Sequence, residues 1–181
     1  MSPPAPAQKW MAPPLSEAQG RDFRELVDRM AGRLLRLAAR VVGDQTQAED
    51  VLQDAWGQVF QAVRQGQFDG RASVDTWLYR IVLRAALNAR RSQARRSRLA
   101  DHSASLVIAN ASAKLDARIA LREVAALLDA LPEDQASALV LKEFEGLTAA
   151  EVAKALECSE GAVEQRLVRA RAALRERLSH D

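Results

Sequence analysis

The sequence predicts an all-α protein made of two small helical domains joined by a flexible linker. Helix-favouring residues dominate the 181-residue chain, in which aromatic side chains make up only 4%. Apolar residues recur at helical spacing, and no alternating run of Val, Ile and Thr bounded by turns indicates a strand. A stretch of small and polar residues without a clear period separates two periodic halves.

The first domain is expected over residues 15–98, after a disordered tail at residues 1–14. Five of the six prolines lie in this tail, and a segment rich in Pro, Ala and Ser cannot maintain a helix or a core. Helices are predicted over residues 16–42, 45–64 and 74–96, with a glycine-containing loop before the last one. Their expected core positions are Leu26, Met30, Leu34, Leu37, Val41, Leu52, Ala55, Val59, Ala62, Val63, Val74, Trp77, Leu78, Ile81, Ala85 and Leu87.

The second domain is expected over residues 115–181, after a linker at residues 99–114. Its helices are predicted over residues 116–130, 132–144, 148–156 and 160–178. Thr148 and Glu151 have the spacing of a capping box. Ser159 suits the N-cap of the last helix.

Charge is segregated along the chain, although the formal net charge is only +2. Residues 71–98 contain eight arginines and one acid, a net charge of +7. Residues 116–160 contain ten acids and four bases, a net charge of −6, and residues 161–178 return to +3. Two basic faces suggest two polyanion contacts, and a pair of solvated Arg-rich faces explains the charge equally well.

Several classes of protein are disfavoured by the composition. A single cysteine, Cys158, allows no intramolecular disulfide, and the two histidines, His102 and His180, are far from it in sequence. No stretch approaches the ~20 apolar residues of a membrane span, and the N-terminus lacks the features of a secretory signal. There is no Gly-rich phosphate loop and no nucleophile beside an evident base. We therefore expect a cytoplasmic, non-enzymatic protein without a metal or cofactor.

Residues 147–174 have the layout of a helix-turn-helix within the second domain. A short capped helix is followed by a turn around residues 157–159 and by a longer helix whose outer face carries Gln165, Arg166 and Arg169. The N-terminal half of such a helix can enter the major groove, where its side chains meet phosphates and base edges. The alternative interpretation is a helical hairpin whose surface is merely basic.

Residues 76–81 (TWLYRI) begin a second candidate site, and Arg84, Asn88, Arg90 and Arg91 follow them on the same predicted helix. Aromatic and Arg side chains beside a loop can hold an unstacked base and its flanking phosphates. The arginine face favours nucleic acid binding, whereas a core position is favoured for the tryptophan itself.

Residues 48–56 (AEDVLQDAW) form a third candidate site, on an acidic helix start that suits the helix dipole. Gln53 and Trp56, if exposed, would suit a protein partner, because tryptophan is enriched among binding anchors. The alternative interpretation is that Trp56 packs inside.

In this order and combination, the motifs make the sequence resemble the extracytoplasmic-function (ECF) branch of bacterial sigma factors, from about Phe23 to Leu178. The matching motifs are Ala48–Trp56, Thr76–Ile81, Leu131–Gln135, Leu139–Gly146 and Gly161–Leu174. The resemblance implies a protein that directs core RNA polymerase to promoters and initiates transcription. The chemistry of RNA synthesis would belong to the polymerase.

The resemblance also implies site residues and partners. The implied contacts with the clamp of the largest polymerase subunit are Asp50, Gln53, Asp54 and Trp56. The implied contacts with the −10 promoter element are Phe68, Arg71, Trp77, Arg80, Arg84, Asn88 and Arg91. The implied contacts with the −35 element are Ser159, Ala162, Gln165, Arg166 and Arg169. The second domain would dock on the flap of the second large subunit, and an anti-sigma factor would hold the protein inactive.

Four residues depart from the pattern of this family. Arg84 replaces a common Asn, and Ala162 and Glu164 replace a Thr and a basic residue of the recognition helix. An acid near the groove repels phosphate unless it accepts a hydrogen bond from a cytosine amino group. Glu157 stands where Gly is common, so the turn is expected to carry strain of about 1 kcal/mol.

A stand-alone helix-turn-helix regulator is the alternative function. It predicts binding to duplex DNA as a dimer without polymerase, whereas a sigma factor predicts weak binding by the free protein. The arginine face that follows residues 76–81, placed before the helix-turn-helix, favours a sigma factor. A helical adaptor without a DNA role would leave both basic faces unexplained.

Overall fold

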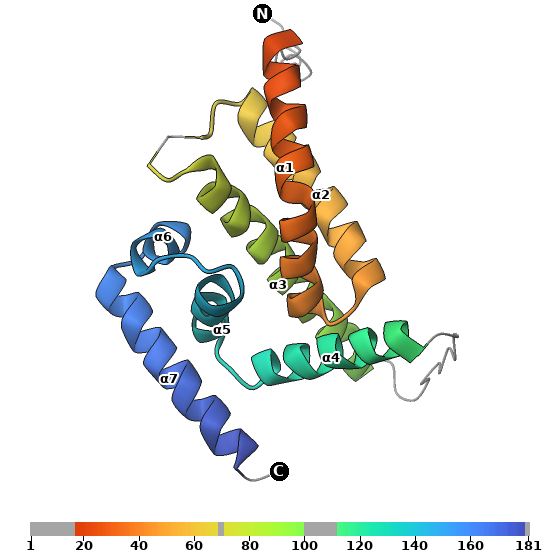
Figure 1. The fold of residues 1–181 in the computed structure, drawn as a ribbon, viewed down its shortest axis with the longest axis vertical. Coiled ribbons are helices and arrows are strands. Elements are labelled where there is room, and N and C mark those ends of the chain that lie inside the picture. The colour runs from red at the N-terminus through yellow and green to blue at the C-terminus, as the bar shows by residue number, and fades with distance from the viewer. Residues whose placement is uncertain (1–16, 69–70, 100–111, 180–181) are drawn as a thin grey trace, which may run out of the picture.

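The computed structural model describes residues 17–68, 71–99 and 112–179 (Figure 1). Every regular element in these ranges is helical, which confirms the all-α class. The elements are α1 (Glu17–Val42), α2 (Gln45–Arg64), α3 (Val74–Leu99), α4 (Ser112–Asp129), α5 (Glu133–Leu139), the π-helical turn η2 (Val140–Phe144), α6 (Ala149–Ala155) and α7 (Glu160–Leu178). The predicted tail and most of the predicted linker lie outside the described residues.

Helices α1, α2 and α3 pack against one another and form the N-terminal bundle (Figure 1). Their apolar stripes lie inside, because burying such side chains is the main favourable contribution to folding. The predicted core positions that are buried in α1 and α2 are Met30, Leu34, Leu37, Val41, Leu52, Ala55, Val59 and Ala62. Leu26 and Val63 pack at its edge. The periodicity therefore predicted this core correctly.

The inward face of α3 is broader than the sequence indicates. Trp77, Leu78 and Leu87 are buried as predicted, but Val74, Ile81 and Ala85 are only partly buried. The buried positions that a single stripe did not predict are Tyr79, Val82, Leu83 and Ala86. Because α3 packs on α1 and α2 and also on α6, two adjoining arcs of its surface are covered. One helical stripe could not account for both arcs.

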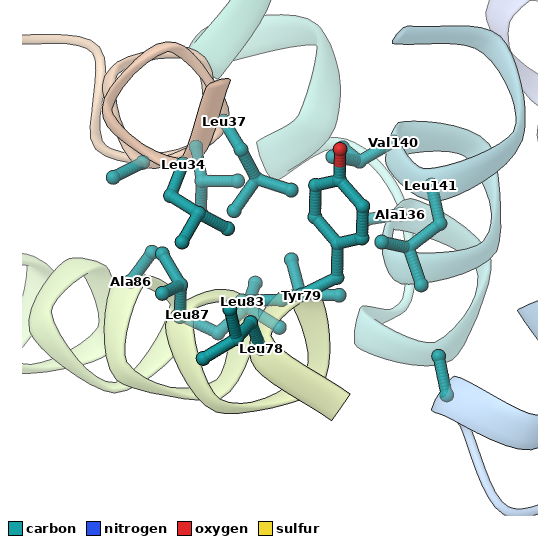
Figure 2. Packing of buried hydrophobic residues seen from close by; sticks show 14 of the residues in the cluster. Leu34, Leu37, Leu78, Tyr79, Leu83, Ala86, Leu87, Ala136, Val140 and Leu141 are labelled. Atoms are coloured by element: carbon teal, nitrogen blue, oxygen red, sulfur yellow. The ribbon is translucent and has the colours of Figure 1, made fainter. Parts of the chain in front are cut away.

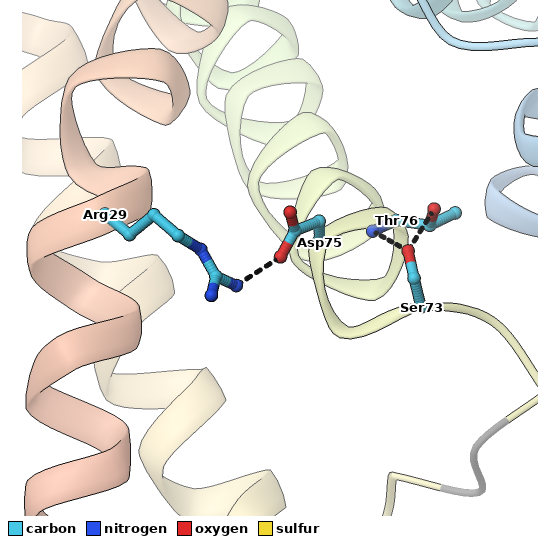
Figure 3. Close-up of polar contacts among 4 residues, drawn as sticks. All are labelled: Arg29, Ser73, Asp75 and Thr76. Carbon is cyan, nitrogen blue, oxygen red and sulfur yellow. Dashed lines mark hydrogen bonds and ion pairs between the residues drawn. The ribbon is translucent and has the colours of Figure 1, made fainter.

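Local polar contacts fix the beginning of α3 (Figure 3). The Ser73 hydroxyl accepts a hydrogen bond from the Thr76 backbone N–H at 3.1 Å, as an N-cap does. The Ser73 and Thr76 hydroxyl oxygens also lie 2.8 Å apart. Asp75 pairs with Arg29 of α1 at 2.6 Å. The first turn of α3 is thereby held against α1.

Helix α4 packs mainly on α1 rather than on the helices that follow it. The contact lies beside Gly43, which has a φ of +78° at the end of α1. A Cβ atom at Gly43 would lie 2.9 Å from the Cβ of Ala125. Both the left-handed backbone and the close approach therefore require glycine at this position.

Helices α5, α6 and α7, together with η2, form the C-terminal unit. The predicted capping box is confirmed: the Thr148 hydroxyl accepts from the Glu151 N–H, and the Glu151 carboxylate accepts from the Thr148 N–H. The predicted N-cap Ser159 accepts from the Ala162 N–H at 3.2 Å. Pro132 lies one position before the first turn of α5, at its N-cap.

The N-terminal bundle and the C-terminal unit share one apolar core (Figure 2). The ring of Tyr79 projects from α3 toward Val140 and Leu141 of the C-terminal unit. Leu34 and Leu37 of α1 lie on the other side of this ring. The two parts are consequently packed together as a closed arrangement.

Candidate nucleic-acid interface

The helix-turn-helix consists of α6, a tight turn and α7. The turn runs through Glu157, whose φ of 52° is the only positive φ of a non-glycine residue in the described ranges. A left-handed conformation costs an L-residue about 1–2 kcal/mol. The strain expected at Glu157 from the sequence is thus located in the turn that sets the angle between α6 and α7.

Helix α7 buries Val163, Leu167 and Ala170 and turns its opposite face to solvent. Gln165 and Arg169, two of the predicted −35 contacts, lie exposed on this outward face. Ser159 is also exposed, and Ala162 is partly buried. Side chains on an exposed face at the start of such a helix can contact phosphates and base edges in the major groove of DNA.

Arg166 is placed differently from the other predicted −35 contacts. Its Nε lies 3.1 Å from the Asp134 carboxylate of α5, and its Nη1 lies 3.2 Å from the Cys158 sulfur. Its side chain is only 26% exposed. In this arrangement Arg166 connects α5, the turn and α7, so it helps to hold the helix-turn-helix together.

Val168 belongs to the outward face of α7, although the sequence analysis did not select it. It is 64% exposed, unusually so for a large apolar side chain. It lies three residues after Gln165, which in a helix places it on the same side. A search for apolar residues that lie off the core stripe would have found it. Such a side chain can contact a thymine methyl group.

Five of the predicted −10 contacts lie on α3, and we call the four polar ones the α3 stripe: Arg80, Arg84, Asn88 and Arg91. Intervals of four, four and three residues place them on one side of the helix. Arg84, Asn88 and Arg91 are exposed, and Arg80 is partly buried. A guanidinium row of this kind can follow a phosphate backbone.

Phe68 and Trp77 precede the α3 stripe and contact each other, with ring centroids 5.4 Å apart. Trp77 is buried, which agrees with the core position favoured for it, and Phe68 is partly buried. Both rings line a cavity of about 500 Å³ together with Arg71 and Arg80. The far wall of this cavity belongs to the C-terminal unit and includes Lys154.

The predicted polymerase contacts lie on α2. Asp50, Gln53 and Asp54 are exposed. Trp56 is partly buried and packs against the core, so it lies between the two interpretations, an exposed binding anchor and a residue packed inside. The helix buries Val59 and Ala55 around it, which leaves only part of the indole for a partner.

Two ionisable groups have displaced pKa values. Burial of the phenol and the nearby Glu145 carboxylate raise the pKa of Tyr79 to about 12. Hydrogen bonds from the Thr148 backbone and hydroxyl lower the pKa of Glu151. Both pKa shifts follow from structural contacts. The shift of Tyr79 reflects its burial in the closed arrangement, and the shift of Glu151 reflects its hydrogen bonds in the cap of α6.

The described part of the chain gives no support for other kinds of site. It contains no group of three His, Cys, Asp or Glu side chains placed to hold a metal ion. No helix within it is both long and apolar enough to span a membrane.

Comparisons with known proteins agree with this geometry. Residues 26–96 match the family Sigma-70 region 2, and residues 121–174 match Sigma-70, region 4. The RNA polymerase sigma-H factor of Pseudomonas aeruginosa is 34% identical over 85% of this chain and 84% of its own length. The ECF RNA polymerase sigma-E factor of Escherichia coli K12 is 31% identical, with 84% of each chain covered.

Two solved structures are also similar. One, titled as CnrH in complex with the cytosolic domain of CnrY, matches with a TM-score of 0.67 and 31% identity, over 90% of both chains. The other, titled as the sigma factor RpoE in complex with the anti-sigma factor NepR from Bartonella quintana, matches with a TM-score of 0.63 and 25% identity. It covers 89% of this chain and 99% of its own.

The fold and its two basic helices define a DNA-binding transcription protein with a helix-turn-helix. The chain belongs to the ECF family of RNA polymerase sigma factors, which direct core polymerase to promoters.

Proposed function

We propose that the three candidate surfaces divide the work of promoter recognition. The α3 stripe, with Phe68 and Arg71, binds the −10 element, and the outward face of α7 binds the −35 element in the major groove. The exposed polar side chains of α2 bind the clamp of the largest polymerase subunit. The polymerase performs the chemistry, and this chain supplies recognition.

One observation carries this proposal: the two basic faces lie on separate parts of the fold. The α3 stripe falls within the region 2 match and the face of α7 within the region 4 match. Two elements of one promoter need two readers held apart, whereas a stand-alone regulator needs only the helix-turn-helix. The paired aromatic rings beside the α3 stripe further support contact with unstacked bases.

We also propose the partners and the compartment. Core polymerase would be bound through its clamp and, by the C-terminal unit, through the flap of the second large subunit. One of the similar structures is titled as a sigma factor in complex with an anti-sigma factor, which supports an anti-sigma partner for this protein. From these proposed partners we infer a cytoplasmic location.

The deciding experiment is reconstitution with sigma-free core polymerase. The full chain should co-elute with core on a sizing column and support run-off transcription from genomic fragments. Gln53→Ala and Asp54→Ala should weaken the complex, while Gln61→Ala, an exposed change two turns further along α2, should not. Duplex binding as a dimer, without any affinity for core, would instead support the stand-alone regulator.

A further inference from the structure

Helix α7, at the edge of the molecule (Figure 1), carries an acid among the residues expected to meet DNA. Glu164 is exposed and lies in the second turn of this helix. It precedes Val168 of the outward face by four residues, so the two side chains lie on the same side of α7. A carboxylate at this place needs an explanation, because it repels the phosphates that a DNA-reading helix approaches.

Glu164 has no ion pair with any residue that the structure describes, unlike three other acids of the C-terminal unit. Those acids are held by arginines, in the pairs Asp134–Arg166 at 3.1 Å, Glu143–Arg171 at 2.5 Å, and Glu157–Arg80. A carboxylate that the fold does not use in this way can accept hydrogen bonds from another molecule. Glu164 is therefore placed to contact a donor on bound DNA.

The chemistry of the base edges limits what this carboxylate can bind. An ionised carboxylate only accepts hydrogen bonds. In the major groove, cytosine presents an amino donor, guanine and thymine present acceptors, and adenine presents an acceptor beside its amino group. Cytosine is therefore the base that Glu164 favours most.

The apolar side chain one turn further along α7 adds a second preference. Val168 is 64% exposed and has no hydrogen-bonding group, so the methyl group of thymine is the base feature that suits it. Residues four positions apart are separated by about 6 Å along a helix, and base pairs are about 3.4 Å apart. The two side chains can therefore read base pairs one or two steps apart.

We propose that Glu164 and Val168 set the base preference of the −35 contact, Glu164 for a cytosine and Val168 for a thymine one or two base pairs away. This inference rests on the proposed role of α7 in −35 recognition. The Glu164 carboxylate repels phosphates of every sequence and is compensated only where it meets cytosine. It thus raises the ratio of specific to non-specific binding rather than the overall affinity.

The test uses the full chain with core polymerase and a genomic promoter whose −35 segment has been randomised. Templates that yield run-off transcripts are sequenced for the parent, Glu164→Gln and Val168→Ser. The control is Glu160→Gln, the same change of charge one turn earlier, where the side chain lines the cavity beside the N-terminal bundle. Affinity for a random-sequence duplex is measured in parallel at one fixed salt concentration.

The parent should favour cytosine about tenfold at one position of the segment. Glu164→Gln should lose this preference and favour adenine there, because a glutamine amide pairs with the adenine edge. It should also bind the random duplex more tightly, because a negative charge is removed. Glu160→Gln should keep the base preference of the parent, and Val168→Ser should lose only the preference for thymine.

The outcomes separate this inference from the proposed function. Identical base preferences for the parent and Glu164→Gln would overturn the role of Glu164 and leave the proposed function intact. An unchanged thymine preference in Val168→Ser would overturn the role of Val168 in the same way. If the parent does not bind core polymerase, the proposed function itself fails, and this inference fails with it.

Discussion

The two helices expected to read DNA, α3 and α7, differ in how their arginines are engaged. Arg80 and Arg91 of the α3 stripe pair with acids of the C-terminal unit, whereas Arg169 on the outward face of α7 is exposed and has no ion pair among the described residues. Ion pairs between exposed side chains contribute little to stability, so they do not by themselves hold the two parts together. We therefore expect substitutions at the packed junction to affect the stability of the fold, and substitutions on the outward face of α7 to affect DNA binding.

The largest effect is expected at the junction that brings α4 onto the N-terminal bundle. Gly43→Ala would add a Cβ at a φ of +78° and 2.9 Å from the Cβ of Ala125. Left-handed strain and overpacking together should lower the free energy of unfolding by about 2–4 kcal/mol.

Gly66→Ala is the matched control for that substitution. Gly66 has a φ of +65°, but nothing lies within 4 Å of its added Cβ. Only the backbone strain of about 1–2 kcal/mol should remain. Chemical denaturation of both variants checks the difference, and equal losses would mean that the contact between Gly43 and α4 does not constrain the fold.

The ionisation of Tyr79 should report whether the N-terminal bundle and the C-terminal unit are packed together. The chain contains one tyrosine, so absorbance at 295 nm during a pH titration follows this phenol alone. Burial first, and then the Glu145 carboxylate, raise its pKa to about 12 from 10.0, while Arg33 acts in the opposite direction and Asp75 adds to the rise. The closed arrangement should therefore be fully stable below pH 10 and lose stability as the pH rises from 10 toward 12.

A triple variant, Asp129→Asn/Glu133→Gln/Glu157→Gln, removes three acids that pair with arginines of α3 and should have a Tyr79 pKa closer to 10. A control of equal net charge, Asp28→Asn/Asp116→Asn/Glu123→Gln, removes three exposed acids without an ion pair among the described residues and should keep the parent value. If the parent already titrates near 10, the phenol is in water, and the two parts are not packed together around Tyr79.

Replacing Arg169 or Arg166 of α7 should weaken DNA binding by different amounts, and this difference should be smaller than the effects described above. Arg169→Ala removes an exposed guanidinium from the outward face and should weaken binding to a −35 duplex by about 1–3 kcal/mol if it contacts a base. Arg166→Ala should have a smaller effect on binding, because that side chain is engaged with Asp134 and Cys158. Arg177→Ala, in the last turn, controls for the loss of one charge. Equal losses for Arg166 and Arg169 would show that Arg166 leaves Asp134 to reach DNA.

These differences show where sequence reasoning succeeds and where it stops. Periodicity and capping signals act within one helix, so the bounds of α2 and the caps Thr148 and Ser159 could be predicted. Contacts between distant segments leave no local pattern. The pairing of Arg166 with Asp134 and the burial of Tyr79 depend on how separate helices meet, and neither could be inferred from spacing. The segregated charges were visible in the sequence, but their positions along the chain did not show that some of the opposite charges pair within the molecule.

The smallest effect is expected at the cap of α6, the first helix of the helix-turn-helix. Thr148→Ala removes the hydroxyl of the capping box and should lower the free energy of unfolding by about 1 kcal/mol. Because the pKa of Glu151 is lowered in the folded state, its contribution is present above its ordinary value of 4.5 and is lost as the pH falls below it. The difference in the free energy of unfolding between parent and variant should therefore shrink in acid, which denaturation at neutral pH and near pH 3 would measure.

Ser73→Ala, the equivalent change at the start of α3, is the matched control and should lower the free energy of unfolding by a similar amount. It should show no such pH dependence, because Thr76 rather than a glutamate occupies the position three residues on. If the two variants respond to acid in the same way, the reciprocal hydrogen bonds of the capping box do not stabilise α6.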